Sequence, residues 1–284
     1  MDDLVMVKGK INMKKRSTHA WVWLGYLVVL VFFLTPIVWT IMTSFKDQQL
    51  IHTMKPVFFF KPTLFNYRDI IQNSYIMQFF SNSLIISSIA CLVAIVFGTL
   101  AAYSFSRFKI KRREDIAFWI LSTRMLPPVA SVIPIYLIAS NFGLLDTFSI
   151  LIVLYASFNI PYVVWIMRGF FADIPREIEE AALVDGCSIF GVFRKIVLPL
   201  SIAGLVSTAI FIFVLSINEF IFALVLTSIK SKTVPLAIAA LVTDRGIQWG
   251  QMSASVTILL IPLIIFYAFI QKQLVRGLTF GAIK

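Results

Sequence analysis

The sequence predicts an all-α, polytopic membrane protein with six transmembrane helices and one helix-turn-helix on the cytoplasmic side. Of the 284 residues, 59% are hydrophobic and only 14% are charged, against about 45–50% and about 25% in soluble domains. Six long stretches are nearly free of charge, and most charged residues fall between them. This composition excludes an ordinary soluble domain, because too few polar residues remain to cover a surface in water.

Each of the six stretches is long enough to cross the hydrocarbon core, which takes about 20 apolar residues in a helix. Stretches this long favour helices, which satisfy all their backbone polar groups internally. The expected spans lie near residues 21–45, 79–105, 117–140, 147–167, 201–226 and 251–271. Because the connections are short, we expect a cytoplasmic N-terminal segment over 1–20 and a single transmembrane domain over 21–284.

The first span follows the basic residues Lys14, Lys15 and Arg16, as in a signal peptide, but it continues without a small-residue cleavage site. We therefore expect it to remain uncleaved. Prolines inside the spans bend helices and free carbonyl groups. They are Pro36, Pro127, Pro128, Pro134, Pro161 and Pro262. This pattern suits a transporter or a channel, and kinked packing without a function explains a single proline equally well.

The distribution of Lys and Arg between the spans predicts the orientation. Segments rich in basic residues alternate with poorer ones, and the densest basic stretch is RFKIKRRED at 107–115. The positive-inside rule therefore places this loop and both termini in the cytoplasm. The net charge of +11 reflects this topology and anionic lipid headgroups, not nucleic-acid binding.

The fourth connection, residues 168–200, has the composition of amphipathic helices instead of a linker. Acidic residues crowd its beginning, as expected at a helix N-terminus. Gly186 interrupts the helical pattern, so we expect a helix-turn-helix beneath the membrane. Ala181 and Ala182 allow a groove wall to approach closely, and the acidic residues would orient a basic partner. The alternative is a helix that merely lies on the inner leaflet, but such helices favour Lys and Arg.

This connection carries a motif. EAALVDG at 180–186 is followed by nine residues and then by Ile196-Val197-Leu198-Pro199. The pattern resembles the EAA signature of the membrane subunits of binding-protein-dependent ABC importers, and every specified position matches. TRMLPPVASVIPIYLI at 123–138, GLLDT at 143–147 and VRGLTFGAIK at 275–284 resemble the carbohydrate-uptake branch, and within it the smaller permease type of the maltose transporter. SINEF at 216–220 departs, because Ile217 stands where the family commonly has Trp.

The resemblance implies the type I transmembrane domain of an ABC importer, located in a bacterial or archaeal cytoplasmic membrane. The motif helix would be the coupling helix that docks on an ATPase subunit. The residues implied in ATPase coupling are Glu180, Ala181, Ala182, Asp185, Gly186, Ile196, Leu198 and Pro199. The implied partners are a second related permease, two ATP-binding subunits that carry ATP and Mg, and an external solute-binding protein. The implied substrate is a sugar, an oligosaccharide, a polyol or a related glycoside.

The chain itself contains no GxxxxGK[ST] phosphate loop, so ATP hydrolysis would belong to a partner and this subunit would not be an enzyme. No catalytic motif is evident. His19 and His52 stand in separate loops without metal-ligand spacing, and Cys91 and Cys187 form no CxxC pair.

Charged residues inside the predicted spans suggest the translocation pathway, because an unpaired charge in the bilayer is costly. Arg124 lies in the third span and either reaches the inner surface or pairs inside the bundle. Asn218 and Glu219 lie in the outer half of the fifth span. We expect them to face a cavity where they can bond hydroxyl-rich solutes, the alternative being a structural bond to a neighbouring helix.

A self-sufficient secondary transporter or channel is the competing prediction. It accounts for kinked spans and for Glu219, but it leaves the match to the EAA signature as chance. Such carriers usually contain two related halves, and no internal repeat is evident in the sequence. A membrane enzyme is a third possibility, for which candidate catalytic residues are lacking.

Overall fold

The computed structural model describes residues 2–53, 55–72, 74–243 and 246–280. Nearly all regular structure in these ranges is helical. The chain divides into two compact units, one made of Met1–Asp69 with Gln248–Thr257, and the other of Ile70–Ile247 with Ile258–Lys284. The C-terminal helix α14 (Trp249–Phe280) contributes its first turns to unit 1 and the rest to unit 2.

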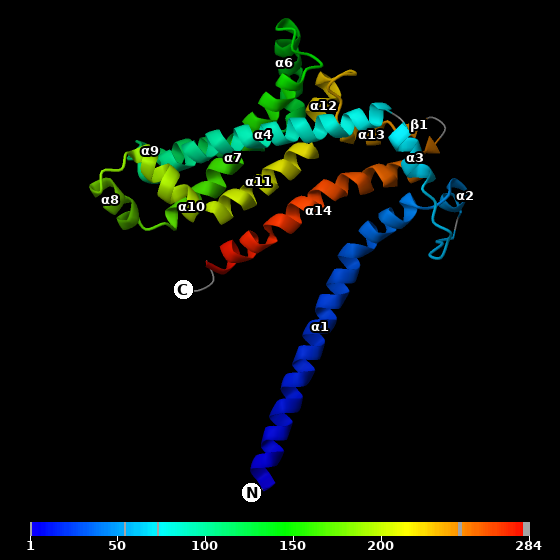
Figure 1. Cartoon of the computed structure of the whole chain (residues 1–284), viewed down its shortest axis with the longest axis horizontal. Coiled ribbons are helices and arrows are strands. Elements are labelled where there is room, and N and C mark those ends of the chain that lie inside the picture. The colour runs from blue at the N-terminus through cyan, green and yellow to red at the C-terminus, as the bar shows by residue number, and fades with distance from the viewer. Residues whose placement is uncertain (1, 54, 73, 244–245, 281–284) are drawn as a thin grey trace. The chain divides into compact units, whose positions relative to one another are not determined.

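Unit 1 is built around the end of a long helix. Its elements are α1 (Asp2–Ser44), α2 (Gln48–Ile51), the first part of α3 (Phe65–Gln72) and the start of α14. Helix α1 begins at Asp2, so residues 2–20 of the expected N-terminal segment 1–20 are helical and continuous with the first span (Figure 1). The side-chain amide of buried Asn66 donates to the carbonyls of Ser44 and Lys46, at 3.0 and 2.9 Å. These bonds attach α3 to the end of α1.

Unit 2 contains the remaining elements. They are α4 (Ser74–Arg107), α5 (Arg113–Ser122), η1 (Thr123–Met125), α6 (Pro128–Asn141), α7 (Phe148–Ala172), α8 (Arg176–Val184), α9 (Ile189–Val192), the π-helical turn η2 (Phe193–Val197), α10 (Leu198–Leu200), α11 (Ile202–Ile217), α12 (Ile221–Leu226), α13 (Val234–Ala239), and the antiparallel strands β1 (Val242–Thr243) and β2 (Gly246–Ile247).

The core of unit 2 lies between α4, α7 and α11, which contact one another along their lengths (Figure 1). Fully buried side chains at this centre include Ile86, Leu151 and Met167. A glycine permits the close approach of α4 and α7. A Cβ atom built at Gly98 would lie 2.5 Å from the Cβ of Val163, nearer than real side chains approach.

Among the described residues, three continuous helices are long and apolar enough to cross a membrane, namely Val22–Ser44, Tyr75–Arg107 and Phe148–Ala172. They correspond to the expected first, second and fourth spans. Two further spans exist only as bent pairs of helices, with angles of 89° and 78° at the breaks. The apolar part of α14 within the described residues, Trp249–Ile265, is shorter. The count of six spans therefore stays a prediction.

The expected third span, 117–140, is not one helix. Helix α5 ends at Ser122, and the chain is extended at Leu126 before α6 begins at Pro128. Consecutive prolines at 127 and 128 explain the break, because a proline disfavours helical geometry in the residue before it and has no amide proton to donate. The expected fifth span, 201–226, is likewise interrupted, since α11 ends at Ile217 and α12 begins at Ile221.

One carboxylate organises the connection between α6 and α7. Asp146, at a positive φ of 56°, accepts hydrogen bonds of 3.0 to 3.1 Å from the backbone amides of Ser228, Ile229, Lys230 and Ser231. Burial alone would raise its pKa, but these amide bonds outweigh burial and hold the pKa of Asp146 well below its ordinary value. The carboxylate thus ties the α6–α7 connection to the segment that follows α12.

Candidate functional site

The connection between α7 and α11 forms two short helices around a sharp turn. Helix α8 carries Glu177 and Glu179 in its first turn and ends at Val184. Gly186 follows with a φ of +86°, a conformation that a glycine adopts without strain. The amide of Gly186 donates to the carbonyl of Leu183 at 3.1 Å, and that of Cys187 donates to Ala182 at 3.0 Å. This pair of bonds is a Schellman motif, which satisfies the last carbonyls of α8.

Helix α9 begins immediately after this turn. The Ser188 hydroxyl accepts a 3.1 Å hydrogen bond from the amide of Gly191 and so caps the helix. The π-helical turn and α10 then lead through Ser201 into α11, with the 78° bend at that point. The helix-turn-helix is therefore joined directly to helices α7 and α11.

The residues of the EAA pattern divide into an exposed set and a supporting set. Exposed residues are Glu180, Ala181, Asp185, Gly186 and Pro199, whereas Ile196 and Leu198 are half-buried and Ala182 is buried in the unit 2 core. Two apolar side chains of the same helix-turn-helix are also uncovered, Val184 with an exposed fraction of 88% and Phe190 with 63%. We call the surface formed by Glu180, Ala181, Val184, Asp185 and Phe190 the α8–α9 face.

A buried ion pair fixes α8 to the end of α4. The Nε of Arg107 lies 2.6 Å from Oε1 of Glu179, and the side-chain exposures are only 10% and 8%. The Tyr103 hydroxyl donates to Oε2 of Glu179 at 3.0 Å. Nη2 of Arg107 also donates to the carbonyls of Phe171 and Ile174, at 2.8 and 2.9 Å. Helices α4, α7 and α8 are thus joined through one guanidinium group.

Local sequence pattern did not reveal this ion pair. By composition, Glu179 is one of several acids at a helix start, and Arg107 is part of a topology-determining loop. The sequence did carry one sign that Glu179 is buried. Glu179 and Ala182 are three residues apart, so they lie on the same helix face. In the structure this face is turned away from solvent. The partner, 72 positions away in the sequence, could not have been assigned from local pattern.

The candidate pathway residues do not form an ion pair with one another. Glu219 is half-buried, and its carboxylate accepts hydrogen bonds from the amides of Phe222 and Ala223, at 3.0 and 3.3 Å. It therefore caps the start of α12. Buried Tyr155 faces this carboxylate. The Tyr155 hydroxyl forms no hydrogen bond with the described residues. Asn218 is exposed and donates to the Val214 carbonyl of its own helix at 2.8 Å.

Arg124 lies in η1, at the break between α5 and α6, and packs on aromatic rings of α7. Its guanidinium carbon is 4.4 Å from the ring centroid of Tyr162 and 5.8 Å from that of Phe158. Its Nε is buried without a hydrogen-bond partner. Phe158 in turn packs on Phe222, at 4.9 Å between centroids. Aromatic faces, not a carboxylate, thus hold this cation among the described residues.

The long apolar helices and the exposed helix-turn-helix that follows α7 define a multi-pass helical membrane protein. Residues 94–280 match the family model described as binding-protein-dependent transport system inner membrane component. The chain belongs to this family. Its membrane location and its nature as a permease component of an ABC transport system follow from this membership.

Curated relatives support the same assignment over nearly the whole chain. A probable ABC transporter permease from Sinorhizobium fredii is 35% identical over 95% of this chain and 97% of its own length. The trehalose/maltose transport system permease protein MalG from Thermococcus litoralis is 33% identical over 92% of this chain and 95% of its own. A chain from a bacterial ABC transporter involved in alginate import has the same fold, with a TM-score of 0.72, 22% identity and coverage of 90% and 97%.

Proposed function

We propose that this chain is a non-catalytic permease subunit of an ATP-driven importer for a sugar, an oligosaccharide, a polyol or a related glycoside. Family membership supports the transport role, and the naming of a relative for trehalose and maltose supports the substrate class. In this proposal the chain forms half of the translocation pathway. A second related permease forms the other half, and an external binding protein delivers the solute. Both termini lie in the cytoplasm.

The single observation that carries the proposal is the exposed α8–α9 face on a rigid support. Uncovered Val184 and Phe190 offer apolar contacts, and Glu180 and Asp185 offer charge to a basic groove. In this proposal the face docks on an ATPase subunit, which holds ATP and Mg. Because the Arg107–Glu179 ion pair joins α8 to α4, closure of the ATPase dimer moves α8 and displaces α4 and α7 with it.

Affinity purification of the tagged chain from its native membrane, in mild detergent, tests this coupling. We expect the wild type to retain an ATPase subunit and a second permease, and Gly186→Asp to lose the ATPase alone, because it strains the turn and adds a charge next to the α8–α9 face. Gly143→Asp is the matched control, since both glycines have positive φ and open space where a Cβ would lie. A chain that purifies alone in every form and transports without ATP would instead be a secondary carrier.

Arg124, Asn218 and Glu219 remain our candidates for the translocation pathway. Exposed Asn218 supports this role, and so does the open hydrogen-bonding capacity of the Arg124 Nε. Glu219→Gln keeps an acceptor for the cap of α12 but removes the charge. We expect it to reduce uptake or alter substrate range in reconstituted vesicles. Unchanged uptake and range would leave Glu219 with the capping role alone.

A further inference from the structure

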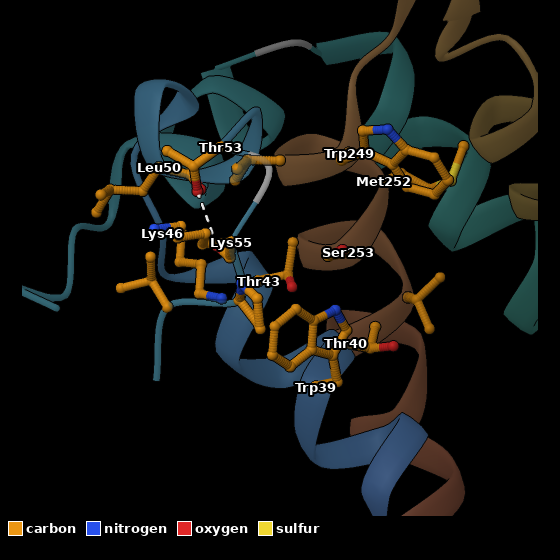
Figure 2. A pocket seen from close by; sticks show the side chains of 14 residues that line it. Trp39, Thr40, Thr43, Lys46, Leu50, Thr53, Lys55, Trp249, Met252 and Ser253 are labelled. Carbon is orange, nitrogen blue, oxygen red and sulfur yellow. Dashed lines mark hydrogen bonds between the residues drawn. The ribbon is translucent and has the colours of Figure 1, made fainter. Parts of the chain in front are cut away.

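Unit 1 contains a cavity of about 570 Å³ that takes no part in the proposed coupling or pathway. Its lining comes from the end of α1, the segment that follows it and the first turns of α14, as Figure 2 shows. The residues that matter for its chemistry are Trp39, Thr43, Lys46, Lys55, Trp249 and Ser253. Two indole rings, two ammonium groups and four hydroxyl side chains, those of Thr40, Thr43, Thr53 and Ser253, therefore line one cavity, and none of the lining residues that the structure describes is Asp or Glu.

Lys46 is a buried cation that forms no ion pair within the part of the chain that the structure describes. Its exposed fraction is 3%, and none of the ion pairs found among the described residues includes it. Its ammonium nitrogen lies 4.0 Å from the centroid of the Trp39 ring and 5.4 Å from that of Phe60. Burial lowers the pKa of Lys46. Aromatic faces orient this cation, but they do not neutralise its charge.

Two of the hydroxyl side chains in the same lining are buried. Thr43 is 8% exposed, and its Oγ1 is buried and has no hydrogen-bond partner among the described residues. Ser253 on α14 is 7% exposed. A buried hydroxyl without a partner is unfavourable by itself. An acceptor bound in the cavity would satisfy Thr43 and compensate Lys46 at the same time.

The geometry points to a ligand that combines an oxyanion with a sugar or polyol body: we propose that this cavity binds such an anionic sugar or polyol. The carboxylate or phosphate oxygens accept hydrogen bonds from Lys46 and Thr43. The C–H face of the ring or polyol lies against Trp39 or Trp249. Exposed Lys55 adds a second positive charge at the cavity. A uronate from the aqueous phase and the glycerol phosphate headgroup of a lipid share this chemistry.

The assembled transporter in nanodiscs of phosphatidylcholine provides the first test, with glucuronate as the anionic probe and glucose as its neutral match. Isothermal titration should show glucuronate binding about tenfold or more tightly than glucose, because one charge-assisted hydrogen bond supplies that difference. Lys46→Met should remove this preference, and Lys46→Arg should retain it. Lys61→Met is the control, since Lys61 is exposed and lies outside the cavity lining.

Native mass spectrometry of the transporter from membranes rich in phosphatidylglycerol distinguishes the lipid source. If the lipid headgroup is the ligand, the wild type and Lys61→Met retain phosphatidylglycerol, Lys46→Met loses it, and glucuronate binds only after the lipid is removed. The proposal is overturned if the wild type binds glucuronate and glucose equally and Lys46→Met retains the same lipid as the wild type. The wild-type comparison needs no variant to fold, and neither arm depends on sugar import or ATPase docking.

Discussion

Arg107 and Glu179 share a site that is almost closed to water, where each needs the other. Removing one partner of a buried ion pair leaves the remaining charge uncompensated, and this typically destabilises a protein by about 3–5 kcal/mol. Here the loss would also release α8, because the same guanidinium bonds the Phe171 and Ile174 carbonyls at the end of α7.

We therefore expect Glu179→Gln to lower the thermal unfolding midpoint and to reduce ATP-dependent transport by more than the loss of folded protein explains. Glu177→Gln, on the same helix but exposed, should change neither quantity, since exposed charges contribute about 0–1 kcal/mol. Unfolding followed in detergent, together with uptake per folded molecule, measures both effects. Equal behaviour of the two variants would mean that the buried pair neither stabilises nor couples.

Asp146 gives a second prediction, which concerns pH. A carboxylate with a depressed folded-state pKa stabilises the protein fully above its unfolded-state value, which is about 3.9, and loses that contribution as pH falls through the folded-state pKa. The backbone amides of residues 228–231 donate hydrogen bonds to the Asp146 carboxylate, and these bonds lower its pKa in spite of burial.

Asp146→Ala should therefore destabilise the protein by about 2 kcal/mol at neutral pH, since hydrogen bonds to charged groups contribute about 1.5–3 kcal/mol. This difference should stay constant from pH 8 to about pH 5 and shrink only in stronger acid. Unfolding midpoints across this range measure it. Asp115→Asn, at an exposed site, serves as the control, and a gap that varies near neutral pH would contradict the mechanism.

At the scale of elements, the contact of α4 with α7 depends on the missing side chain at Gly98. Gly98→Ala should force the two helices apart, because its Cβ would meet Val163, and overpacking of this kind typically costs about 1–3 kcal/mol. Gly25→Ala, in α1 with nothing within 4 Å of the new Cβ, should be neutral or slightly stabilising. Thermal unfolding of both variants in one detergent measures the difference, and equal midpoints would show that α4 and α7 accommodate the methyl group.

The elements also show how far local sequence reaches. Hydropathy located the continuous helices around Val22–Ser44, Tyr75–Arg107 and Phe148–Ala172. A long apolar run in lipid forms a helix because a helix satisfies its own backbone hydrogen bonds. It overlooked the breaks at Leu126 and Asn218, since a window average weighs apolarity and not backbone geometry. The prolines at 127 and 128 did carry the first signal. The cap that Glu219 gives α12 depends on a turn that composition does not reveal.

At the scale of the whole molecule, the fold is shared with a solved alginate transporter chain at only 22% identity. Such a likeness at low identity rests on where apolar, small and helix-breaking residues fall, and these were readable from the sequence. The residues of the proposed site were readable only in part. The EAA pattern marked the α8–α9 face, whereas the support beneath it, from Arg107 and Tyr103, required the packing of α4 against α8.

The proposed orientation can be tested with the two native cysteines. Cys187 is partly accessible beside the turn at Gly186, whereas Cys91 is buried in α4, and its thiol donates to the Ala209 carbonyl. A membrane-impermeant maleimide should label Cys187 in inside-out vesicles and spare it in right-side-out vesicles. Cys91 should stay unlabelled in both and serves as the internal control. Labelling of Cys187 from the outside would reverse the topology and remove the ATPase from consideration as the partner of this face.

The cluster of amides around Asp146 also has a consequence for motion. Ser228, Ile229 and Lys230 are exposed, and exposed loops ordinarily exchange their amide protons quickly. Here each of these amides is held by the same carboxylate, so deuterium should enter this surface loop as slowly as it enters a helix. The backbone of this loop then holds the apolar side chain of Ile229 at a defined position on the surface, with an exposed fraction of 63%.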